Sequence, residues 1–178
     1  LNKNSILIIC PYPENCAAGQ RLKYEQYLGR LRNLGYSIEI SNFMDIKLWK
    51  IIYKKGNTLN KIFGILRGYK RRLMDIFRIK KYDLVYIFMW VTPFGTTIFE
   101  RLFILLSKKV IFDLEDNLFL KNIENNKNNP NPFISLLKNS NKQLILAKQS
   151  NFVISSSPEL DKICRGINIY NQGTYITS

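Results

Sequence analysis

Three carboxylates stand close together in the segment Lys109-Val-Ile-Phe-Asp-Leu-Glu-Asp of this 178-residue sequence. Asp113, Glu115 and Asp116 follow an apolar run that is typical of a buried strand. Because side chains alternate along a strand, Asp113 and Glu115 share one face, and Asp116 lies past the end. The three residues are candidates for a catalytic base, for binding sugar hydroxyls or for holding a cation. The alternative is that one acid caps the following segment.

A second group of candidates lies in the loop Pro11–Arg21, which follows the first apolar run of the chain. Gly19, Gln20 and Arg21 open the next predicted helix. Free backbone N–H groups, close approach at the glycine and the guanidinium of Arg21 favour an anion, phosphate above all. The spacing fits neither a dinucleotide fingerprint nor a P-loop. The alternative is that Gly19 only lets the helix pack against the sheet.

Two further strand ends carry residues that could contact a ligand. Trp90 ends an apolar run and could stack on a sugar or base, although an aromatic ring in this position more often belongs to the core. Ser156 lies in the serine run that follows the apolar segment 151–154. In an open parallel sheet, ligands bind beyond the carboxyl ends of the strands. We therefore expect all four segments to line one crevice.

The positive charge of the sequence is concentrated in one window. The formal net charge is +14, and residues 47–81 hold twelve Lys or Arg residues and a single acid, so that this window alone carries +11. Apolar residues at helical spacing run through it, with basic residues beside or opposite them. The pattern indicates an anionic partner, and the alternative is a solvated basic face. The candidate residues for an anionic surface are Lys54, Lys55, Arg67, Lys70, Arg71 and Arg78.

Composition excludes several kinds of site. The chain contains no histidine, which rules out acid–base catalysis by that residue, and its three cysteines have no metal-ligand spacing. We therefore predict no metal site and a reduced, cytoplasmic setting. No apolar stretch is long enough for a membrane-spanning helix, and the first residues lack the pattern of a secretory signal.

The candidate residues sit on alternating strands and helices, which predicts an α/β fold. We expect a Rossmann-like, doubly wound, mainly parallel sheet in one domain, with helices on both faces. The Asn-rich segment 117–132 is predicted to be a loop. The predicted strands are residues 6–10, 36–41, 84–90, 108–116, 151–157 and 167–170. The predicted helices are residues 20–34, 62–77, 96–106, 133–148 and 159–164.

Several segments, in order, resemble the N-terminal domain of retaining bacterial glycosyltransferases with the GT-B architecture (family 4-like, group 1). The resemblance covers nearly the whole chain, although that family often has an Arg–Glu pair where this sequence has Met89 and Trp90. Many of its members also carry a histidine near the active centre. The similar segments are Gly19-Gln-Arg-Leu-Lys-Tyr-Glu-Gln-Tyr-Leu, Gly35-Tyr-Ser-Ile-Glu-Ile-Ser-Asn-Phe, Tyr82-Asp-Leu-Val-Tyr-Ile, Pro93-Phe-Gly, Lys109-Val-Ile-Phe-Asp-Leu-Glu-Asp and Asn151-Phe-Val-Ile-Ser-Ser-Ser.

The resemblance implies that residues 1–178 form the acceptor-binding half of a glycosyltransferase. Such an enzyme moves a sugar from a nucleotide-sugar to a glycan or lipid-linked acceptor in surface polysaccharide synthesis. The nucleotide-sugar donor would bind a C-terminal domain absent from this chain, so the fragment alone is expected to be inactive and to need no other cofactor. Gly19 and Arg21 would contact donor phosphates or the acceptor. The basic helix would hold the enzyme at the inner face of the plasma membrane.

Two other functions fit parts of the sequence. One is a nucleic-acid-binding module, indicated by aromatic and basic residues interleaved in the window 47–81; the chain shows no recognised nucleic-acid-binding motif, so we expect no nucleic acid partner. The other is a non-catalytic, flavodoxin-like scaffold, in which the acids Asp113–Asp116 would bind Mg²⁺.

Overall fold

The fold is a six-stranded, all-parallel sheet with helices on both faces, which confirms the predicted doubly wound α/β class. The computed structural model describes residues 4–115 and 141–176. The strand order is β2-β1-β3-β4-β5-β6, and every neighbouring pair is parallel. The strands are β1 (Ser5–Cys10), β2 (Ser37–Asn42), β3 (Leu84–Phe88), β4 (Val110–Asp113), β5 (Phe152–Ser155) and β6 (Gly173–Tyr175).

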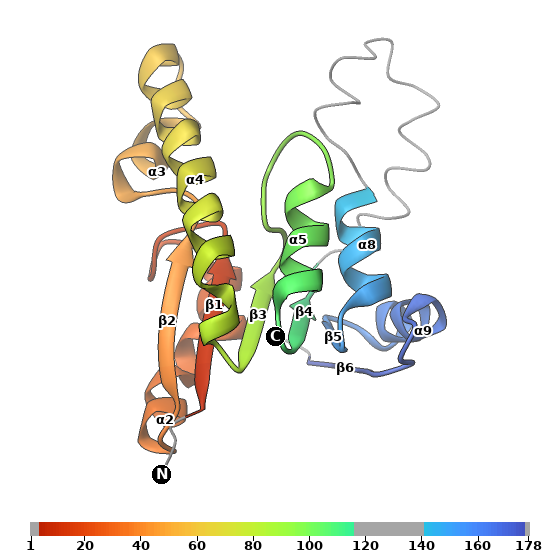
Figure 1. Cartoon of the computed structure of the whole chain (residues 1–178). Helices are drawn as coiled ribbons and strands as arrows, with labels where there is room; N and C mark the ends of the chain where they lie inside the picture. The colour runs from red at the N-terminus through yellow and green to blue at the C-terminus, as the bar shows by residue number, and fades with distance from the viewer. Residues whose placement is uncertain (1–3, 116–140, 177–178) are drawn as a thin grey trace.

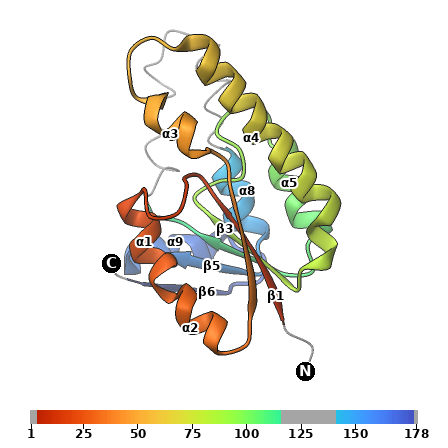
Figure 2. The same cartoon turned by 90° about the vertical axis from the view of Figure 1, so that its left-hand side faces the viewer.

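The helices divide between the two faces of the sheet (Figures 1 and 2). Helices α1 and α2 cover one face over β1 and β2, and α4, α5 and α8 cover the other. The helices are α1 (Ala18–Lys23), α2 (Leu28–Asn33), α3 (Ile46–Ile52), α4 (Thr58–Arg78), α5 (Ile98–Leu106), α8 (Asn141–Gln149) and α9 (Pro158–Ile167), with single 3-10 turns at Glu25–Tyr27 and Ile79–Lys81.

The core has three parts. Two lie on opposite faces of the sheet because alternate residues of each strand point to opposite faces, and the third is formed by Phe43, Met44 and Leu48, just after β2 and in α3. On the α1–α2 side, Ile6 and Ile8 of β1 pack with Tyr24 and Leu28. The larger part lies on the other side, where apolar residues of β1, β3, β4 and β5 meet α5, α8 and α9. Strands buried on both faces explain the nearly continuous apolar runs in the sequence.

The helix predicted over residues 20–34 is divided in two. Helix α1 ends at Lys23, a 3-10 turn follows, and α2 begins at Leu28. Tyr24 leaves the helical region with φ −137° and ψ −29°, and its ring packs against Tyr86 and Phe88. The ring contact therefore accompanies the break in a segment whose apolar spacing predicts one continuous helix.

The last strand was predicted at residues 167–170, and this prediction is wrong. Helix α9 continues to Ile167, and β6 forms at Gly173–Tyr175. Asn168 stabilises the turn between them: its amide group donates to the carbonyl oxygens of Ala147 and Ser150, and its side-chain oxygen accepts from backbone N–H groups of the turn.

Helix α4 turns small and charged residues toward the sheet. A Cβ atom at Gly68 would lie 2.6 Å from the ring of Phe43, and one at Gly64 would lie 2.8 Å from Leu48. The four buried residues of the helix are Gly64, Gly68, Arg72 and Asp75. The side chains of its opposite side, which we call the outward apolar face, are Leu59, Ile62, Phe63, Leu66, Leu73, Met74 and Phe77, all exposed.

Candidate functional site at the carboxyl edge of the sheet

The edge of the sheet where the parallel strands end holds a buried polar cluster. Lys23 of α1 reaches the end of β4, where its Nζ lies 3.5 Å from Asp113 Oδ1. It also donates to the carbonyl oxygens of Ser155 and Ile176, at 3.4 and 3.3 Å. The hydroxyl of Tyr86, on the neighbouring strand β3, donates to Asp113 Oδ2. One ammonium group thus connects α1 to β4, β5 and the segment after β6.

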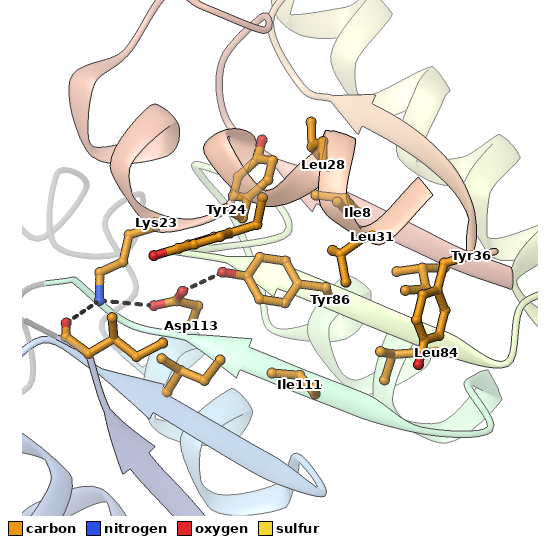
Figure 3. A pocket seen from close by; sticks show the side chains of 14 residues that line it. Ile8, Lys23, Tyr24, Leu28, Leu31, Tyr36, Leu84, Tyr86, Ile111 and Asp113 are labelled. Atoms are coloured by element: carbon orange, nitrogen blue, oxygen red, sulfur yellow. Dashed lines mark hydrogen bonds and ion pairs between the residues drawn. The ribbon is translucent and has the colours of Figure 1, made fainter. Parts of the chain in front are cut away.

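This cluster closes one end of an apolar pocket of about 380 Å³. Figure 3 shows the pocket between the α1–α2 segment and the sheet, with Lys23, Asp113 and Tyr86 together at one end. Asp113 Oδ1 accepts no hydrogen bond from the described residues, although it forms the ion pair with Lys23. The apolar lining includes Ile6, Ile8, Leu28, Leu31, Leu84, Ile111, Ile154 and Ile176. The pocket suits an apolar group that carries one hydroxyl or amine.

Burial controls the ionisation of the cluster. It raises the pKa of the Asp113 carboxyl above its usual range, while the hydrogen bond from Tyr86 and the charge of Lys23 oppose this shift. Burial and the neighbouring Asp113 carboxylate raise the pKa of the Tyr86 hydroxyl well above 10.0. At neutral pH the Tyr86 hydroxyl is therefore protonated and donates its hydrogen to Asp113.

The predicted anion position at Gly19 is occupied by a side chain of the protein itself. A Cβ atom at Gly19 would collide with Glu115 Oε1, so the Glu115 carboxylate lies directly against this glycine. The Ser156 hydroxyl donates to the backbone oxygen of Glu115. The loop after β1 and the ends of β4 and β5 thus meet at one place. An external phosphate would bind here only by displacing Glu115.

The two residues that follow Gly19 have different environments. Gln20 is buried, and its side-chain amide bonds both backbone groups of Tyr12 and the carboxylate of Glu25, so it holds the loop Pro11–Ala17 in place. Arg21 is exposed, and no bond from its side chain to another described residue is formed. Only Arg21 of this pair is placed to meet a ligand in solvent.

Trp90 belongs to an aromatic cluster beyond the ends of β1, β2 and β3. Its ring centre lies 5.6 Å from that of Phe43, which in turn lies 5.3 Å from Tyr69. Met89, just before it, has φ +62°, and the Trp90 N–H donates to the Phe88 oxygen at 2.8 Å. Such left-handed backbone in a non-glycine residue costs about 1–3 kcal/mol and is found most often at functional sites.

Two buried cations fix the loops of this edge. Arg72 donates to the carbonyl oxygens of Cys10, Ser41 and Val91, which lie at or just past the ends of β1, β2 and β3. Its guanidinium also pairs with Asp75 at 3.2 Å. Burial lowers the pKa of Arg72, and the Asp75 carboxylate opposes this shift.

Lys142 plays the same part for the loop between β3 and α5. Its Nζ donates to the Thr92 hydroxyl and to the Phe94 carbonyl oxygen, both at 2.6 Å, and lies 3.6 Å from Glu100. Burial lowers the pKa of Lys142, and the Glu100 carboxylate opposes this. The segment that carries Trp90 is therefore held by internal ion pairs.

The six residues predicted to meet an anionic surface fall into two groups. Arg71 donates to two backbone carbonyl oxygens after β2, and Arg78 pairs with Asp75 and Glu39. Arg67 lies 3.7 Å from the carboxylate that caps α3, and is itself half exposed. The other three side chains, with no ion pair to a described residue, are Lys54, Lys55 and Lys70.

Sequence reasoning missed the buried cations. Lys23 lies four residues before Tyr27 and eight before Leu31. It therefore falls on the apolar face of the helix predicted over residues 20–34, where a buried lysine needs a partner. The same signal marks Arg72, which lies three residues before Asp75 and is fully buried. Nothing in the spacing of the sequence identifies Asp113 as the partner of Lys23.

The predictions about metal binding and membrane location are tested only in part, or not at all, by the described residues. Asp116 lies outside the described residues, so the proposed Mg²⁺ site is not tested. Within residues 4–115 and 141–176, no three Cys, Asp or Glu side chains gather as metal ligands would. No helix in the same ranges has the length and hydropathy needed to span a membrane.

No protein-family model and no curated protein is similar to this sequence. The functional argument therefore depends on the residues of the site.

Proposed function

We propose that this chain supplies the acceptor side of a glycosyltransferase, which moves a sugar from a nucleotide-sugar to a glycan or lipid-linked acceptor. The observation that carries the proposal is the meeting of three loops at one edge of the sheet. Glu115 and Ser156 follow the ends of β4 and β5 and are bonded to each other, and Gly19, at the start of α1 after the β1 loop, contacts the Glu115 carboxylate. Arg21 lies exposed two residues from this contact.

The pocket supports an acceptor with an apolar part. Its lining is almost wholly apolar, and its polar end offers Asp113 Oδ1, which is paired with Lys23 but accepts no hydrogen bond from the described residues. A hydroxyl of the acceptor would donate to this oxygen, while the apolar part would lie along β3, β4 and β5. Lipid-linked acceptors combine these two features.

The reaction defines what each side of the cleft must do. The acceptor oxygen forms a bond to C1 of the donor sugar, and the bond between C1 and the phosphate oxygen breaks. The bonding electrons leave with the nucleoside diphosphate, whose departing phosphate oxygen takes the proton of the acceptor hydroxyl. In our proposal the present chain orients that hydroxyl, and Arg21 attracts the phosphates through a charge-assisted bond. Donor binding and the transfer itself require the second domain.

A binding titration on the chain tests the proposal. The ¹⁵N-labelled protein is titrated with UDP-glucose, UDP-N-acetylglucosamine and a short-chain prenyl-diphosphate monosaccharide, and amide shifts are followed by NMR. We expect shifts in residues 12–21, 113–115 and 155–157 with at least the lipid-linked sugar. The Arg21→Ala variant should bind about tenfold more weakly, because one charge-assisted hydrogen bond is lost.

The matched control is Arg30→Ala, which removes an equally exposed arginine from α2 and should leave binding unchanged. Shifts confined to other parts of the molecule would overturn the proposal. So would the lack of any shift with all three probes, or equal weakening in the Arg21 and Arg30 variants.

A further inference from the structure

The outward apolar face of α4 is the largest group of exposed apolar side chains on one element of the described chain. Phe77 is 81% exposed, Phe63 is 61% exposed and Leu66 is 57% exposed. A helix of 21 residues is about 30 Å long, so these side chains extend along most of a small domain. Contiguous apolar surface of this size marks an interaction site.

The direction of this face is fixed by the packing beneath the helix. Gly64 and Gly68 leave no room for larger groups against Leu48 and Phe43. Arg72, farther along, bonds the carbonyl oxygens at the ends of three strands. Turning α4 over would bury apolar residues where these carbonyl oxygens need donors. The outward apolar face therefore belongs to the native fold.

Basic residues border this face along one edge. Arg67, Arg71 and Arg78 follow one another at helical spacings of four and seven, and Lys70 lies among the apolar residues, four residues after Leu66 and four before Met74. A surface hollow of about 460 Å³ is lined jointly by Phe63, Leu66, Arg67 and Lys70 with Asn60. Lys54 and Lys55 lie exposed in the turn just before the helix.

We propose that the outward apolar face of α4 binds an anionic membrane surface, with the helix lying in the plane of the interface. Leu66, Leu73 and Phe77 enter the boundary between headgroups and acyl chains. Arg67, Lys70 and the lysines before the helix meet the lipid phosphates. Arg71 and Arg78 are held by partners within the chain, so their contribution is smaller.

Charge and shape favour a lipid surface over other partners. Three arginines of residues 47–81 are bonded to the protein's own backbone or carboxylates. A nucleic acid at this helix would therefore meet mainly apolar side chains and few basic groups. A second copy of the chain would bring the same basic border against itself. An anionic bilayer offers negative phosphates beside an apolar layer, which matches the border and the face together.

This inference is independent of the sugar-transfer proposal, because α4 contributes no residue to the pocket at the carboxyl edge. Loss of vesicle binding would leave the acceptor titration unaffected. A failed titration would equally leave the membrane proposal in place.

Vesicle flotation tests the proposal on the intact chain. Vesicles of phosphatidylglycerol with phosphatidylcholine should bind the protein at low salt, and vesicles of phosphatidylcholine alone should bind it at least tenfold more weakly. The double variant Leu66→Ser/Phe77→Ser should lose more than tenfold in partitioning, because two apolar side chains no longer leave water. Lys70→Gln should lose about fivefold, the contribution of one basic residue near an anionic surface.

The matched control is Leu34→Ser, which changes an equally exposed leucine at the end of α2, away from α4. It should bind like the unchanged protein, and circular dichroism should show the same fold for every variant. Equal loss in the Leu34 variant, or no preference for anionic vesicles, would overturn the proposal. It would also be overturned by a chain that ignores vesicles but binds single-stranded RNA, or that forms dimers which the double variant dissolves.

Discussion

Helices α4 and α9 lie on the same side of the sheet but turn opposite kinds of residue inward. Helix α9 buries Leu160 and Cys164 in the larger part of the core. Helix α4 fully buries two glycines and the Arg72–Asp75 pair, and it exposes most of its apolar side chains, while Ile65, Tyr69 and Ile76 are partly buried. Both helices have a clear apolar side. Periodicity therefore identifies the faces of a helix, and the surface beneath it decides which face turns inward.

The two surfaces beneath these helices differ in chemistry. Helix α9 packs on β5 and β6, where apolar side chains such as Val153 project from the strand. Helix α4 crosses the ends of β1 and β2, where backbone carbonyl oxygens accept hydrogen bonds from Arg72 of the helix. A buried carbonyl needs a donor, and Arg72 supplies donors to several at once. The four predictions below test this difference.

The largest effect is expected at Arg72. The Arg72→Met variant keeps the unbranched apolar stem of the side chain but removes the fully buried partner of Asp75 and one hydrogen-bond donor to each of three carbonyl oxygens. The free energy of unfolding should fall by about 3–5 kcal/mol. Urea denaturation measures it, with Arg67→Met as the half-exposed control, which should change stability by less than about 0.5 kcal/mol. Equal losses in the two variants would contradict the role assigned to Arg72.

Removing a large apolar side chain should have opposite consequences in the two helices. Leu160→Ala in α9 empties a buried position and should cost about 2–5 kcal/mol. Phe77→Ala in α4 removes a larger side chain, yet it should change stability by no more than about 0.5 kcal/mol because that ring is exposed. Urea denaturation of both variants decides the matter, and a cost at Phe77 above that at Leu160 would show that α4 faces the other way.

Replacing a glycine by alanine should change the stability of the protein in opposite directions in the two helices. Gly68→Ala places a Cβ atom 2.6 Å from the buried ring of Phe43, which should cost about 1–3 kcal/mol. Gly166→Ala in α9 meets nothing within 4 Å and should stabilise the protein by about 0.5–1 kcal/mol, since alanine is the better helix former. Thermal unfolding followed by circular dichroism gives both signs, and a stabilised Gly68 variant would argue against the close packing of α4.

The smallest effect is chemical and concerns Cys164 of α9. Burial raises the pKa of this thiol from 9.0 to about 11, with a further contribution from Asp161. A thiol with that pKa has about one thiolate in a thousand at pH 8, so alkylation should be slow and should rise about tenfold per pH unit below pH 11. Mass spectrometry after iodoacetamide treatment should find Cys16, which is partly exposed, modified first. Rapid modification of Cys164 at pH 8 would mean that the inward face of α9 is accessible to solvent and reagent, which would contradict its burial.

Much of the fold follows from the sequence, because parallel strands buried on both faces give long apolar runs that local pattern identifies. The first five strands lie where those runs predict them, and Gly35 ends α2 with φ +91°. The break at Tyr24 and the late β6 were not predicted. Each accompanies a contact with a residue distant in the sequence, Tyr86 for the ring and Ala147 for the Asn168 amide.

The candidate site was predicted in part. The rule that strand ends share one edge brought Gly19, Glu115 and Ser156 together correctly as neighbours. It could not show that the Glu115 carboxylate lies against Gly19, nor that the buried Lys23 pairs with Asp113. Both depend on side-chain geometry between distant segments. Whether these residues bind a substrate stays a prediction.

The central claim, that the apolar side of α4 faces outward and meets an anionic membrane, is tested most directly by methionine oxidation. Met74 on α4 is 57% exposed, whereas Met44 is buried beneath the helix. Peroxide should oxidise Met74 well before Met44 in the free protein, and phosphatidylglycerol vesicles should slow oxidation at Met74 alone. Mass spectrometry of the peptides gives both rates. Oxidation of Met44 first, or no protection of Met74 by vesicles, would contradict the account.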